Sequence, residues 1–316
     1  AVPGRPVLGV YFRHQRKLTD AGLVHLKDLT SLRELELWDT QVTDVGLEHI
    51  KGLTTLKRLC LMNDQFTDDS RQTTDDGLKY LKGMTDLEFL QISGTQMTDA
   101  GLANLSGLRK LRNLRLHIPI TDAGLEHLKA MTKLEFLQLA GTRVTGTGLK
   151  HLSVLTNLKT LWFTGPEVTG IGLKHLNRLP RFETLMFQGP KVTDAELSHL
   201  KELTNLKWLD IGGTPVTDAG LEHLQGLTKL EALDIHETRV TGTGLVHLSR
   251  MSKLTFLVLS KTRVTDAKLV HLKGLSNLES LYIEDTPVTD AGVKDLLTKL
   301  PKCEINPVPS ILFHSF

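Results

Sequence analysis

The feature that most constrains this chain is a short threonine-led phrase that returns at a nearly constant spacing. "ITDAGLEHL" occupies residues 120–128, and "VTDAGLEHL" occupies residues 216–224 of the 316-residue sequence. The spacing is 24 residues at most steps, but 31 residues separate Thr43 from Thr74 and 23 separate Thr98 from Thr121. The phrase begins at twelve threonines: Thr19, Thr43, Thr74, Thr98, Thr121, Thr145, Thr169, Thr193, Thr217, Thr241, Thr265 and Thr289. A fixed period of this length predicts a solenoid, in which each repeat forms one coil and packs only against its neighbours.

Within one repeat the spacing of apolar residues changes, which predicts two kinds of element. In "LTNLKWLDIGGTPVTDAGLEHL" (residues 203–224), Leu209 and Ile211 stand at alternate positions, as in a short half-buried strand. The leucines that follow recur every third residue, which is typical of a short α-helix or 3₁₀-helix. We expect Thr217 or Asp218 to cap that helix, and the glycine to allow close approach of neighbouring coils. At the turn after the strand, we expect the Thr214 hydroxyl to bond the backbone of a neighbouring coil.

These repeats resemble the leucine-rich repeat family, specifically bacterial repeats of the "VTDAGL" type. They are similar to the repeats of F-box-associated proteins, with threonine in place of cysteine, over about residues 7–305. The resemblance implies an α/β fold: a right-handed leucine-rich-repeat solenoid of about 12 repeats, as the twelve phrases also indicate. It further implies a parallel β-sheet on the concave side and short helices or 3₁₀ segments on the convex side. Because no F-box precedes the repeats, a ubiquitin-ligase role is not implied.

We expect one solenoid domain over residues 1–316. Its N-terminal cap or first repeat spans about residues 1–28 and contains a strand in "VLGVYF" (residues 7–12), and the repeats span about residues 29–299. The C-terminal cap, about residues 300–316, is expected to contain a degenerate strand in "LPKCEINP" (residues 300–307) and a packed Cys303. The apolar tail "ILFHSF" (residues 311–316) is expected to fold over the open end, because a solenoid end otherwise exposes its core.

Composition argues against several broad classes of protein. Charged residues make up 23% of the chain and the formal net charge is +2, so nucleic acid is not an expected partner. No run of about 18 apolar residues is present, so no membrane span is expected. Two cysteines, Cys60 and Cys303, argue against a disulfide framework. The chain starts at Ala1 without a signal-type apolar stretch, and the sequence favours neither the cytoplasm nor export. We expect a monomer that binds no cofactor.

Histidine recurs at one helical position, which raises the question of a metal ladder. Nine of the thirteen histidines share this position: His25, His49, His127, His151, His175, His199, His223, His247 and His271. Stacked coils would bring neighbouring imidazoles to about 5 Å, and neutral imidazole is a common metal ligand. However, Tyr80, Asn104 and Asp295 interrupt the row, and no carboxylate or cysteine stands beside every member to complete a closed shell. We therefore interpret the column as part of the convex architecture.

Function specific to this chain is expected at the variable strand positions that point away from the core. All three tryptophans fall there although aromatic residues are 5% of the chain, and Trp, Tyr and Met are enriched at binding hot spots. The sequence therefore predicts a protein or peptide partner on the concave face, with the densest patch on the sixth to eleventh strands. The predicted partner-binding residues are Trp38, Phe89, Phe136, Trp162, Met186, Trp208, Asp210, Asp234, His236, Phe256 and Tyr282.

Two other interpretations of this face stay open. The aromatic residues before the first strand leucine, such as Phe89, can lean sideways and only pack against neighbouring strands. A rim of basic residues beyond the strands can contact an acidic partner, but such charges more often form a solvated edge. That rim comprises Arg143, Lys191, Arg239, Lys261 and Arg263, and Glu167 and Glu237 interrupt it.

No motif in the chain predicts an enzyme. There is no P-loop, no dinucleotide fingerprint, no C-x-x-C pair and no H-E-x-x-H. Cys60 is predicted to lie two strands from His117, about 10 Å away, which is too far for a nucleophile and its base. Asp210, Asp234 and His236 form the one predicted acid–histidine cluster of the concave face. A hydrolase or metal site there, and a purely architectural spacer, are the alternatives to partner binding.

The seven-residue insertion in "QFTDDSRQTTDDGL" (residues 65–78) is expected to form an exposed loop. Its carboxylates, Asp68, Asp69, Asp75 and Asp76, suggest calcium, but their spacing does not match a D-x-D-x-D-G calcium loop. Asp75 also stands at the expected start of a helix. No metal site is therefore predicted in this loop.

Overall fold

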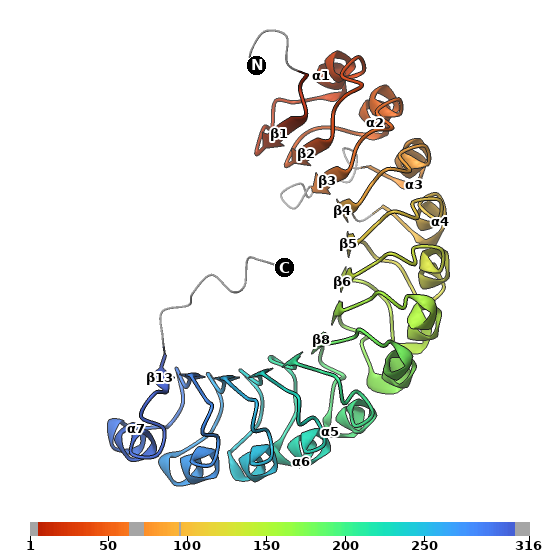
Figure 1. Cartoon of the computed structure of the whole chain (residues 1–316). Coiled ribbons are helices and arrows are strands. Elements are labelled where there is room, and N and C mark those ends of the chain that lie inside the picture. The colour runs from red at the N-terminus through yellow and green to blue at the C-terminus, as the bar shows by residue number, and fades with distance from the viewer. Residues whose placement is uncertain (1–5, 63–72, 95, 307–316) are drawn as a thin grey trace. The chain divides into compact units, whose positions relative to one another are not determined.

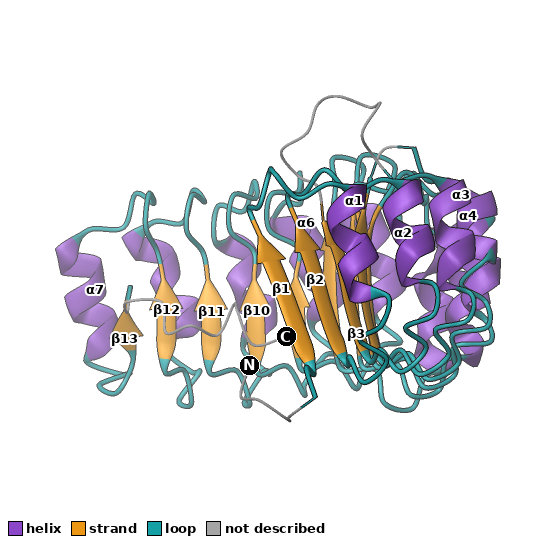
Figure 2. Ribbon diagram, turned by 90° about the horizontal axis from the view of Figure 1, so that it is seen from above, coloured by secondary structure: helices purple, strands orange, loops and turns teal. Residues whose placement is uncertain are grey.

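The computed structural model describes residues 6–62, 73–94 and 96–306. It divides into two compact units, one containing residues up to Gly165 with Arg178–Arg181, and the other containing Pro166–Asn177 and the chain from Phe182 onward. Each unit is a stack of coils in which every coil contributes one strand, and the helical segments lie on one side of the strands (Figures 1 and 2). The predicted solenoid of stacked coils is confirmed within each unit.

The strands of each unit are parallel and follow one another in chain order. Within a unit, each strand pairs with the strand one repeat later, so Leu209 lies in register with Leu233, and Leu233 with Leu257. In the first unit the strands are β1 (Gly9–Arg13), β2 (Glu34–Trp38), β3 (Arg58–Met62), β4 (Phe89–Ser93), β5 (Asn113–His117), β6 (Phe136–Ala140) and β7 (Thr160–Thr164). In the second unit they are β8 (Thr184–Gln188), β9 (Trp208–Asp210), β10 (Ala232–Asp234), β11 (Phe256–Val258), β12 (Ser280–Tyr282) and β13 (Glu304–Ile305).

The threonine-led phrase forms the short helices, as its leucine spacing predicts. Those of the first unit are α1 (Asp20–Leu23), η1 (Val24–Leu26), α2 (Asp44–Ile50), α3 (Asp75–Leu78), η3 (Lys79–Leu81), α4 (Asp99–Ala103), η4 (Gly124–Leu128) and η5 (Thr147–Val154). The second unit has η6 (Gly170–Arg178, of which Arg178 falls in the first unit), α5 (Asp194–Leu197), η7 (Ser198–Leu200), α6 (Asp218–Leu221), η8 (Glu222–Leu224), η9 (Thr243–Leu248), η10 (Asp266–Leu272) and α7 (Asp290–Leu297). No helix among these described segments is long and apolar enough to cross a membrane.

The core lies between the strands and the helices of each coil. The strand leucines, such as Leu209 and Leu233, and the helical leucines, such as Leu221 and Leu224, are fully buried. Among the described residues, Phe163 and Phe187 are the largest fully buried side chains. Burying a leucine or phenylalanine side chain contributes about 1.5–3 kcal/mol, so these repeated positions supply most of the driving force for stacking.

Threonine and aspartate of the phrase have different roles, which the sequence did not distinguish. Thr217 caps α6, because its Oγ1 accepts a hydrogen bond of 3.3 Å from the Ala219 amide. Asp194, from the coil before, accepts two hydrogen bonds from Thr217: the amide lies 2.7 Å from Oδ1 and the hydroxyl 2.6 Å from Oδ2. The same bridge joins Asp20 to Thr43, Asp44 to Thr74, Asp75 to Thr98, Asp99 to Thr121, Asp122 to Thr145, Asp218 to Thr241 and Asp266 to Thr289. The aspartate therefore ties successive coils together.

Four turn threonines, Thr214, Thr238, Thr262 and Thr286, bond within their own coil and not to the backbone of a neighbouring coil as predicted. The Thr214 hydroxyl donates to the Ile211 carbonyl at 2.7 Å, and Thr238 donates to Ile235 at 2.8 Å. Both bonds close a turn within one coil. The prediction was wrong because the short hydroxyl side chain reaches the carbonyl three residues before it more easily than the next coil.

The predicted terminal strands are confirmed as β1 and β13, which pair with β2 and β12. Cys303 is buried as predicted, with 6% of its surface exposed. The insertion segment 65–72, with Asp68 and Asp69, and the tail 311–316 lie outside the described residues. Asp75, just after the insertion, accepts hydrogen bonds from the amide and the hydroxyl of Thr98 in the next coil.

Candidate binding surface on the strand face

The strand face is defined here as the surface formed by every second strand residue, on the side opposite the helices. All eleven predicted partner-binding residues lie on it or at the ends of its strands. Phe136, Asp210 and Asp234 are buried, with 7%, 5% and 6% of their surfaces exposed, and the other eight are half-buried. They are less exposed than the prediction assumed, because strands about 4.8 Å apart allow neighbouring side chains to cover one another.

In the first unit the strand face carries alternating guanidinium groups and aromatic rings. The Arg58 guanidinium lies 3.7 Å from the centre of the Phe89 ring. The Arg115 guanidinium lies 5.4 Å from Phe89 and 4.9 Å from Phe136, and the Phe136 ring meets Trp162 edge-on at 5.2 Å. Burial, followed by repulsion from Arg58, lowers the pKa of Arg115. We call this set, from Arg58 to Trp162, the arginine–aromatic row.

Trp38 belongs to a separate group at the first two strands. Its ring centre lies 5.7 Å from that of His14, whose Nδ1 is 2.8 Å from Oδ2 of Asp39. Beside it, the buried Glu36 forms ion pairs with Arg13 at 2.7 Å and with Arg58 at 3.2 Å. Glu36 thus anchors the first arginine of the arginine–aromatic row.

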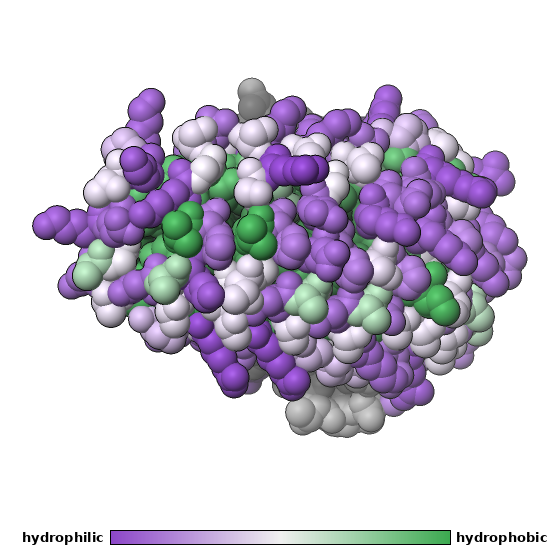
Figure 3. Space-filling model, turned by 90° about the horizontal axis from the view of Figure 1, so that it is seen from below, coloured by the Kyte–Doolittle hydropathy of each residue, from purple (hydrophilic) through white to green (hydrophobic). Residues whose placement is uncertain are grey.

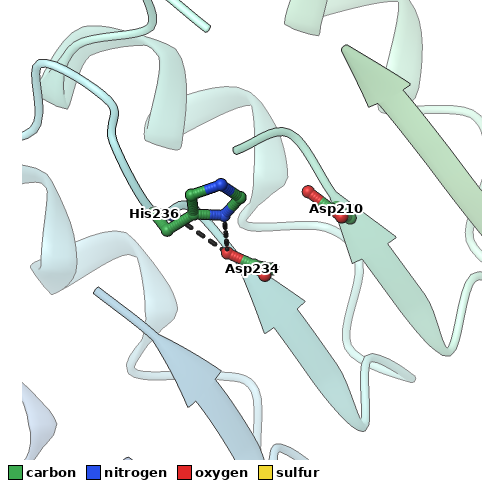
Figure 4. Close-up of side chains that lie close together, drawn as sticks. All are labelled: Asp210, Asp234 and His236. Atoms are coloured by element: carbon green, nitrogen blue, oxygen red, sulfur yellow. Dashed lines mark hydrogen bonds and ion pairs between the residues drawn. The ribbon is translucent and has the colours of Figure 1, made fainter. Parts of the chain in front are cut away.

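In the second unit Asp210, Asp234 and His236 come together, as Figure 4 shows. Asp210 and Asp234 occupy the same register position on β9 and β10. His236 follows β10 and folds back, so that its Nδ1 and its amide nitrogen lie 2.8 Å and 2.9 Å from Oδ1 of Asp234. Asp210 Oδ1 accepts hydrogen bonds from Gln188 at 2.8 Å and from the Gly212 amide at 2.9 Å.

The electrostatics of these three residues are unusual for a surface. Burial, followed by the negative charge of Asp234, raises the pKa of Asp210 to about 6. The hydrogen bond to Asp234 raises the pKa of His236 above its ordinary value. Two carboxylates and an imidazole at this distance can hold a cation or transfer a proton.

The remaining predicted residues of the second unit lie on β8, β9, β11 and β12. The Phe256 and Tyr282 rings are 5.2 Å apart on β11 and β12. Trp208 lies on β9 in register with Thr184 and Ala232, and Met186 lies on β8 in register with Asp210. Phe136 and Trp162 belong to the first unit. The patch predicted on the sixth to eleventh strands therefore consists of two groups of residues, one in each unit.

Several polar residues of the strand face were not predicted to contribute. Arg58, Arg115 and Gln188 stand at the same variable strand positions of the repeat as the predicted residues. Their position within the repeat could therefore have identified them. Two lysines of the basic rim form exposed ion pairs, as is typical of a solvated edge. Lys191 pairs with Glu167, and Lys261 Nζ lies 3.5 Å from Glu237 Oε2. The glutamates that interrupt the rim in the sequence are therefore its partners in the structure.

Neither cysteine has the properties of a catalytic nucleophile. Cys60 is 3% exposed, and burial raises the pKa of its thiol to about 12. Burial likewise raises the pKa of Cys303 to about 11. Both thiols therefore stay protonated at neutral pH, whereas the thiolate is the reactive form.

The histidine column lies on the helical side, as predicted. Its members are half-buried, except His25, which is exposed. Within the described segments, the side chains that come close enough together to share a metal ion are Asp210, Asp234 and His236. No histidine of the column belongs to this group. On the face drawn in Figure 3, apolar side chains form small patches separated by hydrophilic ones.

Comparison with known proteins supports the fold. Residues 28–51 match the family model described as "Leucine Rich repeat". The structure resembles an internalin of Listeria monocytogenes with a TM-score of 0.65 and 22% identity, covering 96% of this chain and 88% of that one. It also resembles the plant peptide hormone receptor RGFR1, solved in complex with RGF2, with a TM-score of 0.53 and 14% identity, covering 95% of this chain and 49% of that one.

A leucine-rich-repeat protein of Leptospira interrogans is also similar, with a TM-score of 0.49 and 17% identity, covering 89% of this chain and 85% of that one. The comparison with curated proteins finds no significant match. The repeat at residues 28–51, the stacked parallel strands and the internalin likeness together show that this chain is a leucine-rich-repeat solenoid protein.

Proposed function

We propose that this protein binds a protein or peptide partner on its strand face and is not an enzyme. The arrangement that carries the proposal is the arginine–aromatic row, in which Arg115 is held between Phe89 and Phe136. Trp and Arg are the residue types most enriched at binding hot spots. Among the similar structures, the receptor RGFR1 was solved with a bound peptide hormone, RGF2.

The physical basis of binding is preorganisation. Arg58, Phe89, Arg115, Phe136 and Trp162 already contact one another on neighbouring strands. A flexible side chain loses about 0.5–1.5 kcal/mol of conformational freedom when a partner immobilises it. Because these side chains are fixed before association, most of that cost is removed.

The second unit offers a surface of different charge for the same partner or for another segment of it. Trp208 stands two residues before the buried Asp210 on β9, and Phe256 and Tyr282 lie on β11 and β12, the two strands that follow the buried Asp234 on β10. We propose that these residues contact basic or polar groups of the partner, whereas the arginine–aromatic row contacts acidic or aromatic groups. The near-balanced net charge of +2 does not favour nucleic acid as the partner. We also propose that the protein is a monomer with one solenoid domain of the bacterial "VTDAGL" type.

Site-specific crosslinking tests which face the partner occupies. A photoreactive benzoylphenylalanine is placed at Gln138 on β6, in register with Trp162, or at Ala232 on β10, in register with Trp208. It is expected to crosslink a discrete protein in extracts of the source cells. The same probe at Val154 or Val246, on the helical side and 48% and 45% exposed, is expected to give no such product. Crosslinking from the helical positions alone would contradict the proposal.

A hydrolase at Asp234 and His236 is the second candidate, favoured by their 2.8 Å contact. In such an enzyme His236 would act as a base oriented by Asp234. A turnover screen against ester, peptide and phosphoester substrates decides this, with Asp234→Asn as the control. Turnover that Asp234→Asn abolishes would replace the binding proposal for the second unit.

A further inference from the structure

We propose that Asp210, Asp234 and His236 bind one divalent first-row transition ion, with Zn²⁺ as the best match. Each residue offers one donor atom, and the two carboxylate oxygens and one ring nitrogen all lie within 4.8 Å of one another. They come from β9, β10 and the turn after β10, and Figure 4 shows the imidazole above Asp234 and beside Asp210. The inference does not depend on the partner-binding proposal.

The distances suit a small ion. Zn²⁺ binds imidazole nitrogen and carboxylate oxygen at about 2.0–2.2 Å, so tetrahedral donors around it lie roughly 3.4 Å apart. His236 Nδ1 and Asp234 Oδ1 are 2.8 Å apart, and the widest pair in the group is within 4.8 Å. Small side-chain rotations therefore bring all three donors into the first coordination sphere, without movement of the strands.

Charge at this position also favours a dication. Asp210 and Asp234 are adjacent on paired strands and are 5% and 6% exposed. Among the described residues, the ion pair that these carboxylates form is the one between Asp234 and His236. Buried charges are costly unless they are compensated. A divalent ion with two carboxylates and a neutral imidazole has a net charge of zero, which removes this cost.

The donor types define the class of ion. One imidazole nitrogen and two carboxylate oxygens suit Zn²⁺, Co²⁺ or Ni²⁺, whereas Ca²⁺ requires six to eight oxygen ligands. Three protein ligands leave at least one position open to water or to a ligand atom from a partner. The site is thus an open one, unlike the closed four-ligand sites that serve structure alone.

Surrounding residues already orient the ligands. Gln188 donates a hydrogen bond of 2.8 Å to Asp210, as outer partners of metal-bound carboxylates do. The His236 ring occupies the space beside Gly212 where a β-carbon would stand, so a side chain at position 212 would displace the ring. Both features hold the donors near one another before an ion arrives.

Calorimetric titration of the full chain with Zn²⁺, after chelator treatment, tests the proposal. We expect one Zn²⁺ per chain at this site, with an affinity that falls at least about tenfold in Asp234→Asn and in His236→Gln. Ca²⁺ is expected to give no binding. Binding of Co²⁺ should quench the fluorescence of Trp208, two residues from Asp210, in a variant that carries Trp38→Phe and Trp162→Phe.

The histidine column on the helical side requires a matched control, because surface histidines also bind Zn²⁺. His223→Gln removes an imidazole of the column in the same unit and should leave the Asp234-dependent binding unchanged. The proposal is overturned if Zn²⁺ binding survives Asp234→Asn and His236→Gln, or if no binding is measured. Unchanged thermal melting of His236→Gln, a half-buried position, establishes that lost binding is not lost folding.

Discussion

Replacement of Gly148 by alanine is expected to lower the free energy of unfolding by about 3 kcal/mol, measured by urea titration. A β-carbon at this position would meet the Cα and carbonyl oxygen of Asp122, in the preceding coil, at 2.8 Å. These are backbone atoms, so the clash is relieved only by separating the two coils. That separation would also weaken the 2.9 Å hydrogen bond from the Gly148 amide to Asp122.

Gly107 provides the matched control in the same unit. A β-carbon there would have no atom within 4 Å. Gly107→Ala should therefore leave stability unchanged or raise it by about 0.4–1 kcal/mol, because alanine restricts the unfolded chain. Equal effects of the two substitutions would show that the phrase glycine does not set the distance between coils.

Asp194→Ala is expected to destabilise the protein by about 2–3 kcal/mol, since it removes both hydrogen bonds to Thr217 and leaves the Thr217 amide unpaired. Asp290 begins α7 as Asp194 begins α5, but no threonine-led phrase follows it, and it is exposed. Asp290→Ala should cost less than about 1 kcal/mol, which is the usual contribution of an acidic residue at a helix start.

The difference between these two variants isolates the bridge between coils, because the helix-start contribution is common to both. Differential scanning calorimetry with both variants measures it. If Asp290→Ala is as damaging as Asp194→Ala, the aspartate acts through its own helix and the bridge contributes little.

The repeat period predicted the fold accurately because it determines which residues meet. A 24-residue step places Leu209 beside Leu233 in a parallel pair, whatever the residues between them. The strand and helix of each coil followed from the change in leucine spacing. The same logic placed Asp210 beside Asp234, so the cluster in the second unit was predictable from the period alone.

Contacts between side chains of different coils were harder to predict. Threonine and aspartate are both common helix caps, so the sequence did not show that Thr217 caps while Asp194 bridges. The burial of Phe136 and the position of Arg115 between two rings depend on how neighbouring strands share space. The position of a residue within the repeat predicted whether it lies on the strand face. It did not predict which neighbouring side chains would bury it.

The strand-face proposal is tested most directly by the affinity of the crosslinked partner for Trp162→Ala and Trp208→Ala. Each variant is expected to weaken binding by more than ~1 kcal/mol, about fivefold in Kd, without a change in thermal stability large enough to unfold the chain. Val154→Ala and Val246→Ala, on the helical side, should bind as the unmodified protein does. Unchanged affinity in both tryptophan variants would contradict the assignment of the binding surface to the strand face.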